Sequence, residues 1–368
     1  MKLDQSIKKL WARITESRWT IAYISFAVLQ MVIAVSLEAI ILQRNEVSHS
    51  TLEAYKIYDG VETPKIAYKN YTYAKYTMQF QSIKHGNIWF MVFQAFLVTL
   101  CISALFFQNT IDIISIAIIN ICLICAAGVQ IYQSNKWITR VNTQIDSDKA
   151  HEIQGLDYYL SNNVVIWEII LLLALIVFDA ASIFFGYKLY KQFGWNIYKK
   201  IGANIQMQRM YRTYLIFVLL LKLDFFLLIC FQILNLVFLF NDPEEQTRNI
   251  IFQSIMVASV IPMVGLALWG VRRENIVAMF LFTVTSVITI ANFLYILAEF
   301  IIKRDEFLLT FLDVLGILLS IMSMVVAYLA VLNFDGGLKD HFQRRNHEGA
   351  INLETGGQGQ RKRFSIDD

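Results

Sequence analysis

The chain has 368 residues, of which 57% are hydrophobic and 17% charged, and its net charge is +3. A soluble protein of this length needs a polar surface and carries about 25% charged residues. The composition and the mean hydropathy of +0.50 therefore exclude a soluble fold, and the nearly neutral charge does not favour nucleic acid as a partner. These values predict an all-α, polytopic helical membrane protein whose main partner is the lipid bilayer.

Eight apolar runs are long enough to cross a hydrocarbon core, which takes about 20 helical residues. In chain order these predicted spans are 19–42, 88–107, 111–132, 164–187, 214–240, 250–271, 276–302 and 307–332. Only residues 108–110 separate the second run from the third, so they must form a tight turn in which Asn109 or Thr110 caps the next helix. If that turn is misread, the number of spans falls to seven.

Lysine and arginine are concentrated on one side of these spans, and residues 188–212 contain basic but no acidic side chains. The positive-inside rule then places both termini in the cytosol. The predicted organisation is a cytosolic amphipathic segment at 1–18, a single transmembrane domain at 19–332 with lumenal loops 43–87 and 133–163 and a basic cytosolic loop 188–212, and a flexible cytosolic tail at 333–368.

The basic cytosolic loop is a candidate binding site for anionic lipid headgroups. Its candidate residues are Lys188, Lys191, Lys199, Lys200, Arg209 and Arg212. On the other side, the tyrosine-rich segment 43–87 surrounds a possible Asp59-Gly60 turn and could form a short β-hairpin. The same segment contains the sequon Asn70-Tyr71-Thr72, which makes Asn70 a glycosylation candidate on the predicted lumenal side.

Three charged residues lie deep in the predicted spans, where each ionisable side chain is costly. Asp179 and Lys222 have matching predicted depths on consecutive spans, and Asp224 points away from Lys222 on the same helix. We expect an Asp179–Lys222 pair, with Asp224 facing a third helix or a cavity. This polar centre either fixes helix register or lines a substrate or proton path; alternatively, its partner is another subunit.

Four further acids lie near the lumenal ends of different spans: Glu38, Glu168, Glu299 and Asp313. Each can be a terminal residue whose carboxylate reaches the interface. Together they can form an acidic vestibule for cations or protons.

Enzyme signatures are missing from the sequence, which has no phosphate-binding loop, nucleophile elbow or zinc-protease motif. All five histidines lie outside the spans, so the sequence predicts no metal site and no cofactor. We expect the protein not to be an enzyme.

Several segments resemble the fungal Golgi apparatus membrane protein family, a family of multi-pass proteins of uncharacterised activity. The segments are 108–120, 200–214, 221–226, 271–275 and 333–339. The resemblance is strongest over KIGANIQMQRMYRTY at 200–214, where Asn204 stands in place of the acidic residue of the family pattern. It implies residence in the Golgi or a related endomembrane and transfers no catalytic or binding residues.

The leading functional hypothesis is a structural or trafficking protein of the endomembrane system that binds lipids or other membrane proteins. A secondary transporter that uses Asp179, Lys222 and Asp224 is the first alternative. A receptor-like sensor with a ligand seat in the lumenal tyrosine-rich segment is the second.

Overall fold

Helices make up nearly all of the computed structural model, which describes residues 11, 13–56, 64–150, 163–201, 205–241, 247–299, 301 and 307–334. Its long helices are α2 (Arg18–Lys56), α3 (Pro64–Phe107), α4 (Thr110–Ala150), α5 (Asn163–Ile201), α6 (Ile205–Asn241), α7 (Thr247–Arg273), α8 (Ile276–Glu299) and α9 (Phe307–Leu332). Each of these 8 helices contains a stretch long and apolar enough to cross a membrane. The predicted all-α polytopic fold with eight spans is confirmed.

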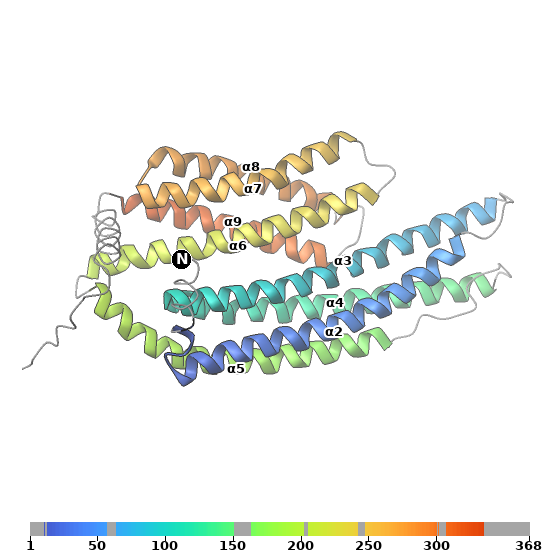
Figure 1. Cartoon of the computed structure of the whole chain (residues 1–368). Helices are drawn as coiled ribbons and strands as arrows, with labels where there is room; N and C mark the ends of the chain where they lie inside the picture. Colours follow the sequence, from blue (N-terminus) through green and yellow to red (C-terminus); the bar gives the residue numbers. More distant parts are fainter. Residues whose placement is uncertain are drawn as a thin grey trace, which may run out of the picture.

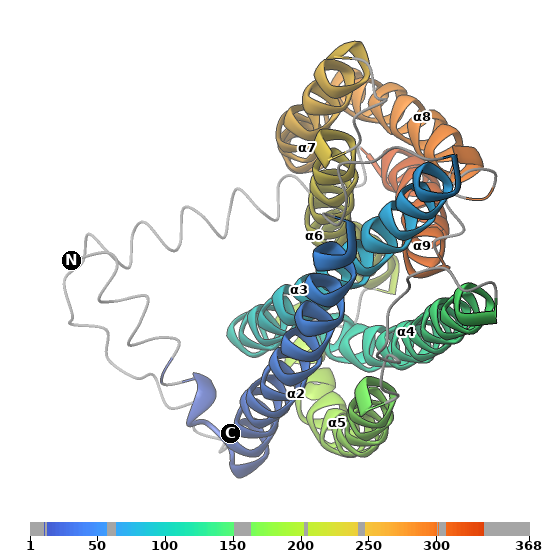
Figure 2. The same cartoon turned by 90° about the vertical axis from the view of Figure 1, so that its right-hand side faces the viewer.

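The helices form two rings of four, which lie side by side (Figures 1 and 2). In the first ring, α2 and α4 each pack against both α3 and α5. In the second ring, α6 and α8 each pack against both α7 and α9. Consecutive helices are antiparallel, so the even-numbered helices all begin at one end of the molecule. We call this end the basic end, because Arg18, Lys188, Arg212 and Arg272 lie there, and the opposite end the far end.

The two rings share the same tight turn between their second and third helices. In the first ring, Gln108 has a φ of 53° and Asn109 caps α4 by accepting a hydrogen bond from the Ile111 amide at 3.0 Å. In the second, Glu274 has a φ of 54° and Asn275 accepts one from the Val277 amide at 2.9 Å. A left-handed residue followed by an Asn cap ends one helix and starts the next within two residues. The sequence predicted a cap at Asn109 or Thr110, and the structure shows that it is Asn109.

Contacts between the rings run from one end of the molecule to the other. Near the middle, the Phe96 ring of α3 stacks on the Phe226 ring of α6 with centroids 3.9 Å apart. Towards the far end, the Gln133 side chain of α4 accepts a hydrogen bond from the Leu308 amide, at 2.8 Å, in the first turn of α9. Side chains of α3 and α4 therefore carry most of the interface with the second ring.

The first ring is longer than the second at the far end, where Figure 1 shows α2, α3 and α4 projecting past the second ring. At about 1.5 Å per residue, the 44 residues of α3 span about twice the thickness of a hydrocarbon core. A separate apolar cluster packs this projection together, formed by Phe80, Ile83, Trp137, Ile138, Val141 and Ile145.

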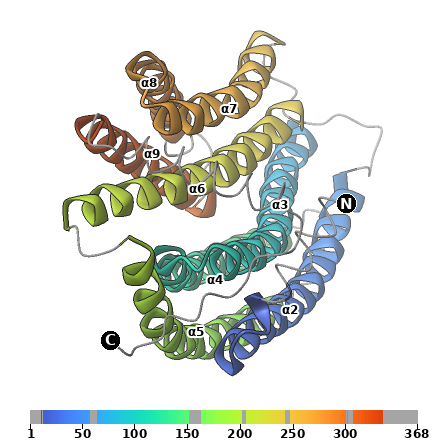
Figure 3. The ribbon, with the colours of Figure 1, turned by 60° about the vertical axis from the view of Figure 1, so that its left-hand side comes forward.

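Much of the sequence that was predicted to form loops is helical in the structure. The predicted β-hairpin is wrong, since the tyrosine-rich segment belongs mainly to α3, while its proposed Asp59-Gly60 turn lies outside the described residues. At the basic end, α5 extends to Ile201 and α6 begins at Ile205, so residues 188–212 are also largely helical (Figure 3). Residues 1–10 and the tail from 335 onward lie outside the described residues.

Candidate functional site

Lys222 of α6 pairs with Asp112 of α4, not with Asp179. The Lys222 Nζ lies 3.0 Å from Asp112 Oδ2 and donates a second hydrogen bond to Ser103 Oγ of α3 at 2.9 Å. The predicted Asp179–Lys222 pair is wrong because the two helices belong to different rings. α5 closes the first ring against α2 and α4, whereas α6 packs against α7 and α9.

The tight α3–α4 turn places Asp112 opposite Lys222. Asn109 Nδ2 donates to Asp112 Oδ1 at 2.9 Å, and Gln108 Nε2 donates to Glu16 Oε2 at 2.7 Å. The second bond sets the turn level with the start of α2, so Lys222, which pairs with Asp112, lies near the basic end. The sequence marks Asp112 only as an acidic residue in the first turn of a helix, which gives no indication of this tertiary contact.

Asp224 and Asp179 each occupy a site of their own. Asp224 is 1% exposed and accepts a hydrogen bond from Ser323 of α9, so it faces a third helix as its position relative to Lys222 predicts. Asp179 is buried on α5, and its Oδ1 has no hydrogen-bond partner. The three residues of the predicted polar centre therefore do not come together, and they do not define a transport path.

Two of the four acids near the far end come together, and the other two lie elsewhere. Glu38 of α2 and Glu168 of α5 are each 1% exposed and lie close enough to repel each other electrostatically when both are charged. Asp313 is buried in the second ring, and Glu299 is the last residue of α8. The four residues thus do not line a single open vestibule.

Polar side chains of α3 and α4 surround the Glu38–Glu168 pair. Ser134 donates a hydrogen bond to Glu168 Oε1 at 2.7 Å. The Gln130 side chain, one turn earlier on α4, lies next to both carboxyl groups, and its Nε2 donates to Asn87 Oδ1 at 3.0 Å. Asn87, Gln130 and Ser134 are not among the residues predicted from the sequence, although amide and hydroxyl side chains inside or beside apolar runs are themselves a signal of buried polar contacts.

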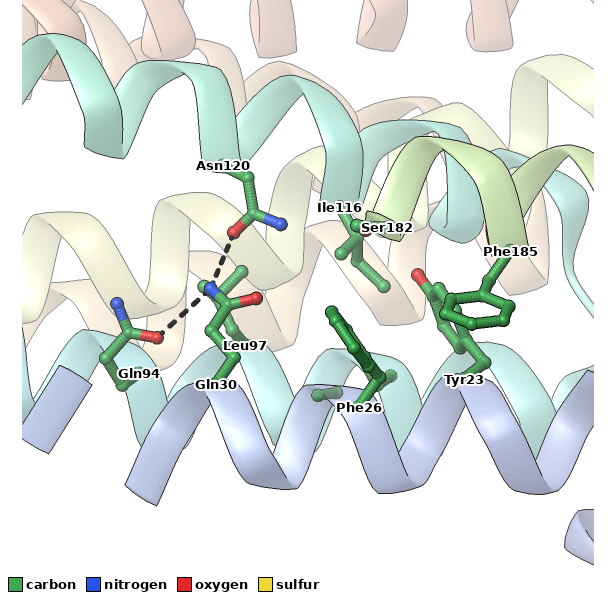
Figure 4. A pocket seen from close by; sticks show the side chains of 11 residues that line it. Tyr23, Phe26, Gln30, Gln94, Leu97, Ile116, Asn120, Ser182 and Phe185 are labelled. Carbon is green, nitrogen blue, oxygen red and sulfur yellow. Dashed lines mark hydrogen bonds between the residues drawn. The ribbon is translucent and has the colours of Figure 1, made fainter. Parts of the chain in front are cut away.

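A second buried polar group consists of three amides in the first ring (Figure 4). Gln30 Nε2 donates to Gln94 Oε1 at 3.3 Å and to Asn120 Oδ1 at 3.2 Å, joining α2, α3 and α4. These side chains line a pocket together with Tyr23, Ser182 and the Phe185 ring. The pocket has space for about one water molecule, so it accommodates no organic substrate.

The predicted lipid-binding residues are distributed over the basic end. Lys188 and Lys191 lie on the surface of α5, and Arg209 and Arg212 are exposed on α6. The Lys199 and Lys200 side chains lie outside the described residues, as does that of Asn70, whose backbone is part of α3.

The eight long apolar helices define an integral membrane protein, and their contacts arrange the eight spans in two rings of four. Within the described residues, no group of three or more histidine, cysteine, aspartate or glutamate side chains is placed to hold a metal ion. Comparison of the chain with protein families, with curated proteins and with solved structures finds no match in any of the three.

Proposed function

We propose that this chain is a resident multi-pass protein of the Golgi or a related endomembrane, which binds anionic lipid headgroups at a cytosolic basic end. Residence rests on the resemblance of segments such as 200–214 to the fungal Golgi membrane protein family. The lipid-binding role rests on one structural observation. This is a cluster of lysine and aromatic side chains at the basic end, formed by the first turn of α2 and the second half of α5.

Two lysines of α5 lie over aromatic rings in this cluster. Lys188 Nζ is 5.5 Å from the Trp19 ring centroid and 5.6 Å from that of Phe184, and Lys191 Nζ is 4.5 Å from that of Tyr187. Trp19 and Tyr187 are well exposed, as amphipathic rings at headgroup level are. Fixed ammonium groups beside interfacial rings suit a lipid phosphate, because the rings sit at the depth of the headgroup.

We expect purified protein to be stabilised more by phosphatidylserine or a phosphoinositide than by phosphatidylcholine with the same acyl chains. Each lysine near an anionic surface contributes about 1 kcal/mol, so the double variant Lys188→Gln/Lys191→Gln should bind anionic lipid about 30-fold more weakly. Native mass spectrometry of retained lipid, together with the unfolding midpoint in lipid titrations, measures this difference.

A matched control uses the same chemistry at the far end. Lys136 lies over the Phe307 ring and Arg140 over the Trp137 ring, at 4.0 and 4.6 Å from the centroids. The variant Lys136→Gln/Arg140→Gln should retain the response to anionic lipid. Equal stabilisation by phosphatidylcholine, or an unchanged response in Lys188→Gln/Lys191→Gln, would refute lipid binding at the basic end.

The proposed orientation places the far end in the lumen and Asn70 within reach of glycosylation. We expect chain produced in a eukaryotic host to migrate faster after treatment with an N-glycosidase, and Asn70→Gln to abolish that change. The same treatment should leave a basic-end variant, Lys191→Gln, with the wild-type shift. Protease or antibody access to the far end from the cytosolic side of intact vesicles would contradict this orientation.

A further inference from the structure

The pocket inside the first ring has the size and the chemistry to bind one small neutral molecule. Its walls combine apolar side chains with amide, hydroxyl and thiol groups from α2, α3, α4 and α5, and none of the residues that line it carries a charge. Its volume is about 20 Å³, whereas a buried water needs about 10 to 15 Å³. All four helices contribute from within their apolar stretches. A ligand of this pocket is therefore about as large as water and needs no counter-charge.

The three amides that line the pocket keep some of their hydrogen-bonding capacity unused. Gln30 donates from its nitrogen to both Gln94 and Asn120, so its carbonyl oxygen can accept a further bond. Asn120 accepts through its oxygen, so its nitrogen can donate. Figure 4 shows this oxygen and this nitrogen turned towards the side of the pocket where Tyr23 and Ser182 lie. Gln94 Nε2 is buried and has no hydrogen-bond partner among the described residues. The amides can therefore bind a polar ligand without breaking the bonds between them.

Two hydroxyl groups line the pocket opposite these amides. Tyr23 of α2 is 3% exposed, and its hydroxyl has no hydrogen-bond partner within the described part of the chain. Ser182 of α5 lies beside it in the pocket wall (Figure 4). Buried polar groups are almost always bonded, either to protein or to ordered water. A buried water typically makes about three hydrogen bonds, and the amides and hydroxyls of this pocket supply the donors and acceptors for them.

We propose that the pocket binds one water molecule, which connects the amides of Gln30 and Asn120 to the hydroxyls of Tyr23 and Ser182. The direct bonds between the amides join only α2, α3 and α4. A water that also bonds Ser182 adds α5, so it joins all four helices of the first ring at one level inside the membrane. The pocket shares no residue with the lysine and aromatic cluster of the basic end, and the water site does not depend on lipid binding.

Hydroxyl-radical footprinting by X-ray radiolysis of the purified full-length chain in detergent tests the proposal. Radicals form from water where it is bound, so a buried side chain beside an ordered water is oxidised although bulk water does not reach it. We expect Tyr23 to be oxidised several-fold faster than Phe282, which is fully buried in the second ring and does not line the pocket. Mass spectrometry of the digested protein gives the rate at each residue.

Three variants separate a bound water from an unbonded hydroxyl. Ala27→Leu places a larger side chain in the pocket wall, so it should displace the water and remove most of the oxidation at Tyr23. Tyr23→Phe keeps the ring and should lower the unfolding midpoint, because a hydrogen bond to water is lost. Without a water, the same change would remove an unbonded buried hydroxyl and raise the midpoint. Ser115→Ala, which removes a hydroxyl bonded to its own helix at 2.8 Å, should leave the oxidation of Tyr23 as in the wild type.

Either of two results would overturn the proposal. Oxidation of Tyr23 no faster than that of Phe282 would show that no water lies beside the tyrosine. A raised midpoint in Tyr23→Phe would show that its hydroxyl makes no bond. Both measurements use the wild type or an isosteric variant, so they decide the question even if Ala27→Leu does not fold. Lipid retention by the same preparations is an independent readout, so failure of the water site is distinguishable from failure of the proposed function.

Discussion

Replacing Lys222 with methionine is expected to lower the free energy of unfolding by about 3 kcal/mol. Methionine preserves the length of the side chain but leaves Asp112, which is 1% exposed, without its counter-charge. Breaking a buried pair from one side costs about 3 to 5 kcal/mol. The lower value applies here because the Lys222 side chain is 29% exposed and Asn109 still donates to Asp112. Unfolding by denaturant or heat in detergent measures the loss.

A double-mutant cycle separates the ion pair from a general effect of losing a lysine. Asp112→Asn removes the charge that Lys222 neutralises, so Lys222→Met/Asp112→Asn should recover much of the stability lost in Lys222→Met. Lys188→Met, which alters a lysine on the surface of α5, should change unfolding stability little. If the effects of Lys222→Met and Asp112→Asn add without coupling, the pair does not hold the second ring to the first.

Substituting leucine for Gly316 is expected to destabilise the second ring by about 1 to 3 kcal/mol, the usual cost of overpacking. A Cβ at Gly316 of α9 would lie 2.9 Å from the Phe293 ring of α8, which is fully buried and packs edge-on against Phe231 of α6. The ring has little room to move, because it is held between three helices. Small residues at helix contacts allow this close approach inside a membrane.

The same substitution at Gly265 provides the control. A Cβ on Gly265 of α7 would meet no atom within 4 Å. Leucine favours a helix more than glycine does, so Gly265→Leu should be neutral or slightly stabilising. Comparable losses for Gly316→Leu and Gly265→Leu would mean that the close contact at Phe293 does not determine stability.

Local sequence was sufficient to predict the spans and the tight turn. Apolar run length identifies a membrane helix, and the two polar residues between such runs limit the cap to Asn109 or Thr110. It was not sufficient for the helix ends, because a helix that leaves the membrane loses its apolar bias. The start of α3 at Pro64 lies in a polar, tyrosine-rich sequence that is equally compatible with a turn and strands.

Which charged residues pair depends on which helices are neighbours, and the spacing of residues in the sequence does not reveal the neighbouring helices. The positions of Asp179 and Lys222 along their spans predicted matching depths. In the structure, however, α5 packs against α2 and α4 within the first ring, whereas α6 contacts α3 and α4 from the second ring. The same closure brings Glu38 and Glu168 together from helices far apart in the chain. Position near the same ends of the spans grouped Glu38 and Glu168 with Glu299 and Asp313, but it could not separate this pair from the other two.

An even number of crossings in each ring has a consequence for insertion. The chain leaves the first ring on the side from which it entered, so the second ring starts with the same polarity, and the turns at Gln108 and Glu274 emerge at the same face of the bilayer. Loss or gain of one crossing in the first ring would invert the second half and place Arg272 and Arg273, in the last turn of α7, at the opposite face of the bilayer. The orientation of the second half therefore depends on an even number of crossings in the first ring.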